Sequence, residues 1–430
     1  MEVFQGTPWL KWTASPRYNE FDKTTIMITR RKLLKTLSSV PVVSGLIGTG
    51  LLTPQLMKAA VSLPAERNFF KELGLRTFIN AAGTYTSMTG SLMSKEVTSA
   101  IAYGATEYVD LDQLHDKVGE RIAELLDCEY ATVSSGAFGA MTIGLAGVIC
   151  GMDTEKVAQL PNTEGFKNEV IVQEAHNIGY THALTNTGAK LVKVKTAKEL
   201  EKAINKKTAM LWFLNANTED GEIKREEFVA LGKQYEIPTF IDCAADVPPV
   251  ENLFKFTKMG FDLVAFSGGK GIRGPQSAGL LLGKRKHIEA ARLHTPPRGT
   301  TIARGMKVNK EEVLGMLVAL ELYLAKDHQK EWELWEQQIK LISDSAQSVA
   351  GVETEIHVPP HANHVPSLRI NWDPKKVGIS AAEARKRLMD GHPAIATVGD
   401  DQTIGITTWM MEPGQERIVA QRLKEVLSGT

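Results

Sequence analysis

The chain has 430 residues, of which 43% are hydrophobic and 23% charged, a composition that is ordinary for a globular protein with a large core. At this length we expect two lobes rather than one. Lysine plus arginine equal aspartate plus glutamate at 50 each, so the chain lacks the basic excess that proteins holding RNA or DNA usually carry. We therefore expect no nucleic-acid partner.

The N-terminal part differs in character from the rest. Residues 1–26 show no periodic pattern and predict no fold, and a translation start at Met27 is the alternative interpretation of them. The adjacent Arg30 and Arg31 precede a mild apolar run over 37–52, which predicts a twin-arginine-like export signal within residues 27–65. Glycines and serines interrupt this run, so we expect no stable membrane insertion. Export to the periplasm is the expected outcome, and a basic first helix on a cytoplasmic protein is the alternative.

Short apolar runs alternate with helical patterns from residue 130 onward, which predicts an α/β fold with a mostly parallel sheet and helices on both faces. In such sheets ligands bind beyond the carboxyl ends of the strands. The seven expected strands are Tyr130–Ser134, Glu169–Gln173, Lys190–Val194, Ala209–Leu214, Pro238–Asp242, Asp262–Phe266 and Ala278–Leu282.

Three structural regions are expected after the signal. The sheet belongs to a large domain over 66–309, and a helical apolar stripe predicts one long connecting helix over 310–350. A proline-rich break then leads to a smaller C-terminal α+β domain over 351–430. The three cysteines lie far apart in apolar segments without a CxxC pair, which predicts buried free thiols at Cys128, Cys150 and Cys243.

Lys270 follows the sixth expected strand in the run Ser267-Gly268-Gly269-Lys270-Gly271. A lysine flanked by glycines at a strand end can bring its amine close to a planar ligand, as a Schiff base requires. The hydroxyl of Ser267 can donate to a phosphate. A phosphate-binding-loop lysine is the rival interpretation, but the spacing GxxxxGK[ST] is absent.

Asp242 ends the fifth expected strand. A buried carboxylate is costly without a cationic partner. The ring nitrogen of pyridoxal 5′-phosphate (PLP) is such a partner, because the cofactor acts as an electron sink when that nitrogen is protonated. Asp246 is the local competitor, and a helix cap or turn is the alternative role for either residue. With Lys270, the pattern predicts PLP as the cofactor.

Two further features follow strands of the same sheet. Ser135-Gly136-Ala137 leads from a strand into a helix, whose free N–H groups and dipole favour a phosphate. His176 follows the second expected strand and can stack on a cofactor ring, or it can be an ordinary structural histidine.

Together these residues resemble fold-type I of the PLP enzymes. More narrowly, the chain resembles the L-seryl-tRNA selenium transferase-like family, in the branch of D-glucosaminate-6-phosphate ammonia-lyase. The matching stretches lie between about residues 73 and 427 and are Phe78–Thr84, Val109–Asp112, Gly119–Arg121, Gly274–Gln276, Met306–Val308 and Trp409-Met410.

The resemblance implies a role for each site residue. Lys270 would be the Schiff-base lysine and the base at the substrate Cα, Asp242 would hold the ring nitrogen, and His176 would cover the ring face. The phosphate would be held by the glycine turn and by the serine before the lysine, namely Ser135, Gly136, Ala137 and Ser267.

The resemblance also implies a homodimer or higher homo-oligomer with its site at the interface. The loop Gly274-Pro275-Gln276 is similar to one that reaches across that interface, which places Gln276 at the cofactor. Arg369 matches the position of an arginine that binds the substrate carboxylate, which a guanidinium can do bidentately. Arg304 and Lys307 are further candidates for an anionic substrate group.

The expected reaction is an elimination of the ammonia-lyase type on a small amino acid or amino-sugar acid. Racemisation or epimerisation, transamination, selenium transfer to L-seryl-tRNA and a non-catalytic binding role remain alternatives, because the pocket chooses among PLP reactions.

His357, His361 and His364 lie in the proline-rich connector. We interpret them as a solvated loop and expect no metal.

Overall fold

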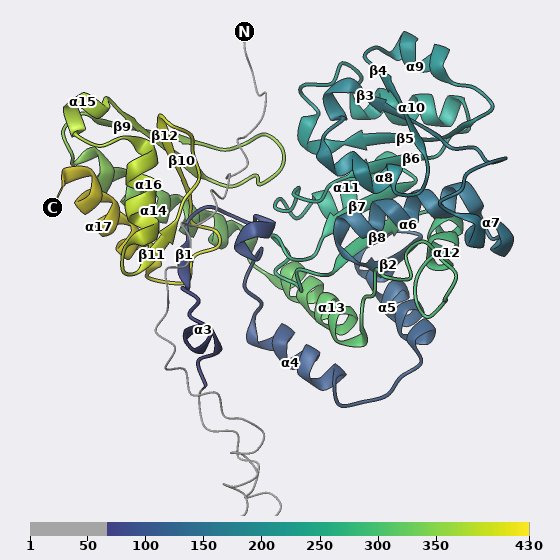
Figure 1. Ribbon diagram of the computed structural model, residues 1–430, viewed down its shortest axis with the longest axis horizontal. Coiled ribbons are helices and arrows are strands. Elements are labelled where there is room, and N and C mark those ends of the chain that lie inside the picture. Colours follow the sequence, from purple (N-terminus) through teal and green to yellow (C-terminus); the bar gives the residue numbers. More distant parts are fainter. Residues whose placement is uncertain (1–66, 430) are drawn as a thin grey trace, which may run out of the picture. The chain divides into compact units, whose positions relative to one another are not determined.

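The computed structural model describes residues 67–429 (Figure 1). The expected export signal over 27–65 and the segment before it lie outside the described residues.

A seven-stranded sheet forms the centre of the larger lobe, in the order β2-β8-β7-β6-β5-β3-β4 (Figure 1). Strand β8 is antiparallel to both of its neighbours, and the other neighbouring pairs are parallel. The expected mostly parallel sheet is therefore confirmed. Its strands are β2 (Tyr130–Ser134), β3 (Glu169–Gln173), β4 (Lys190–Val194), β5 (Thr208–Leu214), β6 (Thr239–Asp242), β7 (Leu263–Ser267) and β8 (Gly279–Gly283).

Helices cover both faces of this sheet, as the strand β5 illustrates. Every residue of β5 is buried, as expected for a strand covered on both sides. Leu211 and Phe213 belong to the core on one face, whereas Met210 and Trp212 belong to the core on the other. The first core includes residues of α4 (Lys95–Gly104), α5 (Leu111–Leu126), α9 (Ala197–Ala203), α10 (Arg225–Gln234), α11 (Asn252–Met259) and α13 (Lys310–Ala325). The second includes residues of α6 (Gly136–Cys150), α7 (Thr154–Gln159), α8 (His182–Thr185) and α12 (Arg285–Arg292).

The smaller lobe is built on a three-stranded antiparallel sheet in the order β12-β10-β9. Its strands are β9 (Val352–His357), β10 (Ser367–Trp372) and β12 (Thr403–Thr407). The helices of this lobe are α14 (His328–Gln347), α15 (Pro374–Val377), α16 (Ala381–Asp390) and α17 (Gln415–Ser428).

The N-terminal strand β1 (Phe78–Asn80) joins this smaller lobe, where it pairs in parallel with β11 (Ala394–Ala396). Ile79 of β1 is buried in the core of the smaller lobe. The expected large domain over 66–309 therefore begins too early, because its first strand completes the C-terminal part of the fold. The short helix α3 (Phe69–Glu72) precedes β1.

The single connecting helix expected over 310–350 is wrong, because two helices occupy this region. Helix α13 ends at Ala325 and α14 begins at His328. Asp327 caps α14 by accepting a hydrogen bond from the backbone N–H of Lys330 at 3.1 Å, as short polar side chains do at helix N-termini. The apolar stripes of the two helices serve different cores: Met316 of α13 packs with the larger sheet, whereas Ile339 of α14 packs in the smaller lobe.

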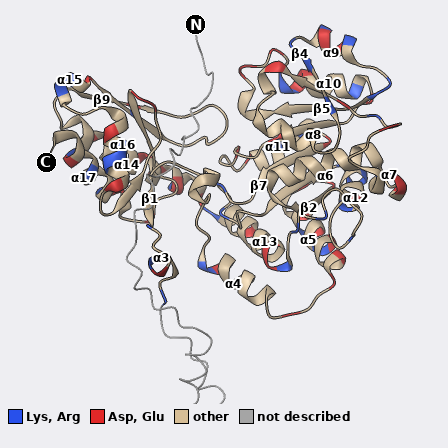
Figure 2. Cartoon of the chain, in the orientation of Figure 1, with Lys and Arg blue, Asp and Glu red and all other residues tan. Residues whose placement is uncertain are grey.

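The structure also bears on the cysteines, on the distribution of charge and on membrane-spanning helices. Cys150 and Cys243 are buried as expected, but Cys128 is only half-buried. Acidic and basic side chains are intermixed on the outer helices, whereas most of the central sheet carries neither (Figure 2). Within residues 67–429, we find no helix that is both long and apolar enough to cross a membrane.

Candidate active site

Asp242 and Lys270 come from neighbouring parallel strands of the large sheet. Asp242 is the last residue of β6 and pairs in register with Ala265 of β7. Lys270 lies in the turn that follows β7. Both residues are therefore at the carboxyl edge of the sheet, where the fold places ligand sites.

Burial shifts the pKa values of both side chains toward each other. Asp242 is 3% exposed, and burial raises the pKa of its carboxyl to about 6, against the hydrogen bond from the Ala244 N–H at 2.9 Å and the charge of Lys270. Burial likewise lowers the pKa of Lys270, while Asp242 and Asp246 oppose that change. The amine is thus closer to its neutral form than an exposed lysine, and the carboxyl lies where a cationic ligand atom would favour its charged form.

The turn that carries Lys270 is closely packed against other backbone segments. A side chain at Gly271 would overlap the carbonyl oxygen of Val247, and one at Gly269 would overlap Gln276. The Gly269 carbonyl also accepts a hydrogen bond from the Ser91 hydroxyl at 3.0 Å. Glycine is thus required here by close approach, which explains why the lysine sits in a glycine-rich run.

The expected phosphate residues meet at one strand, β8. Gly279 of β8 pairs with Ser134 on one side and with Ser267 on the other. These two serines are therefore two strand spacings apart, about 10 Å. Gly136, at the start of α6, has a φ of 66°, a left-handed conformation that glycine adopts without strain. The turn Ser135–Ala137 and Ser267 thus lie on either side of Gly279, at the carboxyl edge of the sheet.

Lys270, Ser267 and Gln276 line a hollow of about 370 Å³ together with Thr86. The side-chain amide of Gln276 donates to the carbonyl of Thr86 at 3.3 Å. Three of the residues that the sequence predicted for the cofactor thus share one space.

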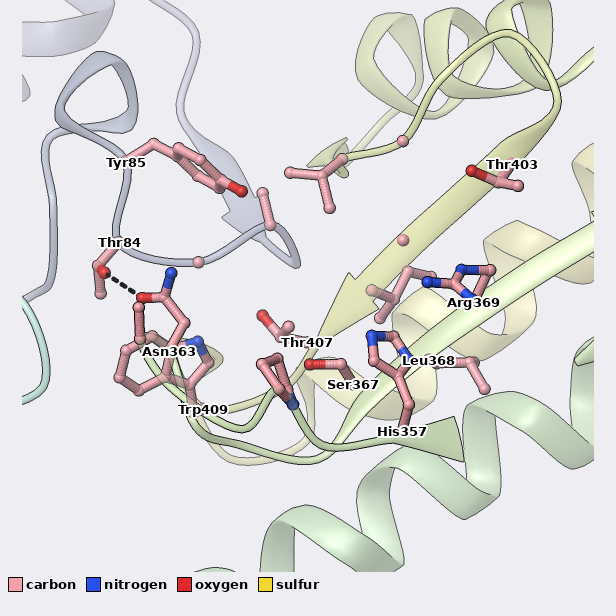
Figure 3. A pocket seen from close by; sticks show the side chains of 18 of the residues that line it. Thr84, Tyr85, His357, Asn363, Ser367, Leu368, Arg369, Thr403, Thr407 and Trp409 are labelled. Atoms are coloured by element: carbon pink, nitrogen blue, oxygen red, sulfur yellow. Dashed lines mark hydrogen bonds between the residues drawn. The ribbon is translucent and has the colours of Figure 1, made fainter. Parts of the chain in front are cut away.

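Lys270 also lines a larger cavity of about 490 Å³ (Figure 3). Arg369 and His357 lie at one side of this cavity, and Asn363 and Trp409 lie at the other. Arg369 is exposed and forms an ion pair with Glu355 at 2.8 Å, so a substrate carboxylate would compete with Glu355 for the guanidinium.

Arg304 and Lys307 are not brought to this site. Neither residue lines the cavity or the hollow beside Lys270. Lys307 is exposed and Arg304 is half-buried in the segment before α13. Within one chain they are therefore not placed to bind a substrate held at Lys270.

The expected stacking of His176 on the cofactor ring is not supported. His176, at the end of the 3-10 turn Glu174–His176, has no exposed surface and packs edge-on against Phe213 with ring centroids 4.4 Å apart. Its Nδ1 accepts from the backbone N–H of Leu214 at 3.2 Å, and its Nε2 donates to the carbonyl of Asn217 at 3.1 Å. Burial lowers the pKa of this histidine to about 4, so the ring is neutral. A histidine without a free face or a free nitrogen holds loops together instead.

Asp246, the competitor of Asp242, is also buried but has a structural partner. Its carboxylate accepts a hydrogen bond from the backbone N–H of Ala362 at 2.9 Å. Asp246 therefore holds the connector between β9 and β10, whereas the backbone hydrogen bond of Asp242 stays within its own turn, at Ala244. Both carboxylates act on the charge of Lys270, Asp242 more strongly than Asp246, and the choice of Asp242 as the ring-nitrogen partner stays a prediction.

The three histidines of the connector have separate environments. His361 contacts Glu219 at 3.0 Å, and His364 contacts the carbonyl of Pro359 at 2.7 Å. His357 lines the large cavity. No three metal-binding side chains come together anywhere in the described part of the chain.

Several cavity residues were not singled out from the sequence as site residues. Thr84 and Trp409 fall inside stretches that carry the family resemblance, yet threonine and tryptophan have no distinctive spacing that would reveal a binding role. Thr407 and Asn363 could be found only once the smaller lobe was in place, since it brings them to the cavity with Lys270.

Comparison with known proteins places this arrangement in a family. The model of the SelA family, L-seryl-tRNA selenium transferase, matches residues 78–351. The chain is 28% identical to the D-glucosaminate-6-phosphate ammonia lyase of Salmonella typhimurium, over 84% of this chain and 98% of that protein. It is also 28% identical to a 5′-C-glycyluridine monooxygenase-decarboxylase of a Streptomyces species, over 83% of this chain and 92% of that protein. A selenium transferase of Alkaliphilus metalliredigens is 29% identical, but the match covers 60% of this chain and 58% of that protein.

Solved structures agree with this assignment. A structure of D-glucosaminate-6-phosphate ammonia-lyase superimposes with a TM-score of 0.74 at 27% identity, covering 84% of this chain and 99% of that one. A variant serine palmitoyltransferase of S. paucimobilis with a bound PLP-myriocin aldimine has a TM-score of 0.52 at 13% identity, covers 81% of this chain and 87% of that one, and shows the common fold alone. The protein is therefore a PLP-dependent enzyme, a lyase or a transferase, of fold-type I, and the chain belongs to the SelA family.

Proposed function

We propose that this enzyme eliminates a substituent from a small amino acid or amino-sugar acid, a reaction of the ammonia-lyase type. The observation that carries the proposal is the buried pair of Asp242 and Lys270 at the ends of adjacent strands. The near-complete coverage of the ammonia lyase relative, 98% of its length, supports the choice of a small-molecule substrate.

The residues present fit PLP. A buried carboxyl whose pKa burial raises to about 6 is suited to a protonated ring nitrogen, which would restore its charged form. The turn at Ser135 and Gly136 and the hydroxyl of Ser267 would hold the phosphate. When bound, PLP withdraws electrons from the Cα of an attached amine and makes the Cα proton acidic.

Lys270 would do two things in this reaction. Its amine would hold the cofactor covalently and, once released by the substrate amine, would take the proton from Cα. The lowered pKa of Lys270 favours both roles, because each needs a neutral amine. Arg369 would orient the substrate carboxylate from the far side of the same cavity, replacing its contact with Glu355.

Selenium transfer to L-seryl-tRNA is the second candidate, favoured by the family model over residues 78–351. Against it stand the neutral charge of the chain and the partial coverage of the selenium transferase of Alkaliphilus, 58% of that protein. Proteins that bind RNA usually present a basic surface.

The decisive experiment is a substrate panel on purified, cofactor-loaded protein. Ammonia and keto-acid release would be measured for D- and L-amino acids, D-glucosaminate and its 6-phosphate. We expect keto acid from at least one of them and none with Lys270→Ala. Exchange of the Cα proton without keto acid would favour racemisation instead. Binding of tRNA with steep salt dependence and no keto-acid release would favour the selenium transferase.

We further propose that the enzyme is exported by a twin-arginine route, on the strength of Arg30 and Arg31 before a mild apolar run. Residues 27–65 would be fused to a reporter that fluoresces only if it folds before export. Fluorescence outside the cytoplasm that is lost with Arg30→Lys plus Arg31→Lys supports export, and fluorescence retained inside contradicts it.

A further inference from the structure

Two unpaired polar atoms lie together in the wall of the Lys270 cavity. The indole Nε1 of Trp409 and the hydroxyl of Thr407 are both buried, and neither has a hydrogen-bond partner in the part of the chain that the structure describes. A Cβ placed on Gly83, another cavity residue, would lie 3.6 Å from the Trp409 nitrogen and 3.9 Å from the Thr407 oxygen. Both atoms therefore face one small region beside Gly83, and Figure 3 shows the two side chains on the same side of the cavity.

The surroundings hold Trp409 in this position. Its ring packs edge-on against Trp335 with centroids 6.5 Å apart, and the side chain is 2% exposed. Its backbone carbonyl accepts a hydrogen bond from the guanidinium of Arg273, which belongs to the turn that follows Lys270. The backbone of Trp409 is thus held by the same turn that carries Lys270.

An indole N–H that is buried without a partner is unfavourable and rare in proteins. Trp335 and the other residues of its cluster, Val365 and Met410, fill the apolar side of the ring. The nitrogen instead lies near Gly83 and Thr407 in the cavity wall, where a ligand atom would complete its hydrogen bonding.

We propose that Trp409 and Thr407 bind a hydroxyl group of a polyhydroxylated substrate chain and select for such substrates. A hydroxyl accepts from the indole N–H, which can only donate, and donates in turn to the oxygen of Thr407, which can accept. Both groups are neutral, so the pair matches a neutral hydroxyl, while the charged Arg369 is left for the carboxylate. This inference rests on the proposed function in assuming that the substrate is an amino-sugar acid held at Lys270.

Other residues of the cavity wall also carry hydroxyl or amide groups. Thr84, whose hydroxyl donates to the side-chain oxygen of Asn363 at 3.5 Å, also lines the cavity. Thr403 lines the opposite wall. A chain with several hydroxyls would meet these groups along the cavity, whereas a short amino acid would leave the Trp409 and Thr407 atoms unpaired.

The test is calorimetric titration of the cofactor-loaded protein with D-gluconate and with hexanoate. Both are six-carbon acids without an amine, so neither can react with the cofactor, and only gluconate carries hydroxyls. We expect Trp409→Phe and Thr407→Val each to weaken gluconate binding by about five- to tenfold, the effect of one neutral hydrogen bond. Hexanoate binding should stay unchanged. Trp332→Phe is the matched control, because it removes an indole N–H of the same cluster that donates to Glu336 outside the cavity lining.

The outcomes separate this inference from the proposed reaction. Equal gluconate affinity in wild type, Trp409→Phe and Thr407→Val would overturn the inference, as would the absence of measurable gluconate binding by the wild type. Selective loss in the two variants would support it even if no substrate released keto acid, in which case the proposed elimination alone would fail. Thr407→Val, which keeps the shape of the side chain, guards against a folding defect in Trp409→Phe.

Discussion

Single residues at the carboxyl edge of the sheet owe their chemistry to burial. Asp242 and Lys270 are ordinary side chains whose surroundings move their pKa values in opposite directions, toward the range where each can exchange a proton near neutral pH. His176 is also shifted by burial, but its hydrogen bonds to Leu214 and Asn217 leave it no reactive nitrogen. Position at a strand end therefore does not by itself identify a reactive side chain.

The shifted carboxyl of Asp242 predicts a pH-dependent stability of the cofactor-free protein. Its pKa is about 6 in the folded state against an ordinary 3.8, so the folded protein binds the proton more tightly than the unfolded chain. This contribution to stability is complete below pH 3.8 and is lost as the pH rises through 6. At pH 7 the loss is at most about 3 kcal/mol.

Asp242→Asn should remove this pH dependence. Thermal unfolding midpoints of the cofactor-free protein would be compared at pH 4.5 and 7.5. We expect the wild type to lose more stability over this interval than the variant, by several degrees. Identical pH profiles would show that Asp242 is not held in a low-dielectric environment.

At the scale of elements, the turn after β7 joins several parts of the fold. Gly271 approaches the carbonyl of Val247, and Arg273 binds the carbonyl of Trp409. The position of Lys270 therefore depends on backbone segments that follow β6 and β12. A steric change in this turn should lower the affinity for the cofactor more than it lowers the stability of the whole fold.

Gly271→Ala tests this dependence. A methyl group there overlaps the Val247 carbonyl, and overpacking of this kind costs about 1–3 kcal/mol. We expect a markedly lower ratio of bound PLP to protein, measured by cofactor absorbance. Gly305→Ala is the matched control, because a side chain at Gly305 would meet open space. Full cofactor content in Gly271→Ala would contradict the proposed role of the turn.

The sequence predicted the strands of the large sheet, but it did not predict where the two lobes begin and end. Strands such as Glu169–Gln173 and Lys190–Val194 were predicted to the residue, because a short apolar run between two helical patterns is typical of a strand in a covered sheet. The break at Asp327 and the pairing of β1 with β11 were missed, since both depend on contacts between segments far apart in the chain. For the same reason the cavity wall at Trp409 could not be anticipated.

At the scale of the whole molecule, the N-terminal part of the described chain carries exposed apolar side chains. Exposed apolar side chains are common at the interfaces of homodimers. These side chains lie in a limited stretch of sequence before α5 and are Phe70, Leu73, Leu92, Tyr103, Tyr108 and Val109. We propose that a second copy of the chain covers them and that Gln276 lies near this contact, as the family resemblance implies.

The proposed assembly predicts a particular result in sedimentation. The loaded enzyme should contain two or more chains of 47.2 kDa at micromolar concentration. Tyr108→Ser plus Val109→Ser, which replaces two exposed apolar side chains, should shift the protein toward single chains and reduce activity. A fully active wild-type monomer would contradict the proposed assembly.

The central claim, that Lys270 holds PLP, has a direct chemical test. The loaded protein would be reduced with borohydride, digested and analysed by mass spectrometry. We predict loss of the visible cofactor band and a pyridoxyl group on the peptide that contains Lys270. A pyridoxyl group on another lysine, or a protein that neither retains nor responds to added PLP, would contradict the account.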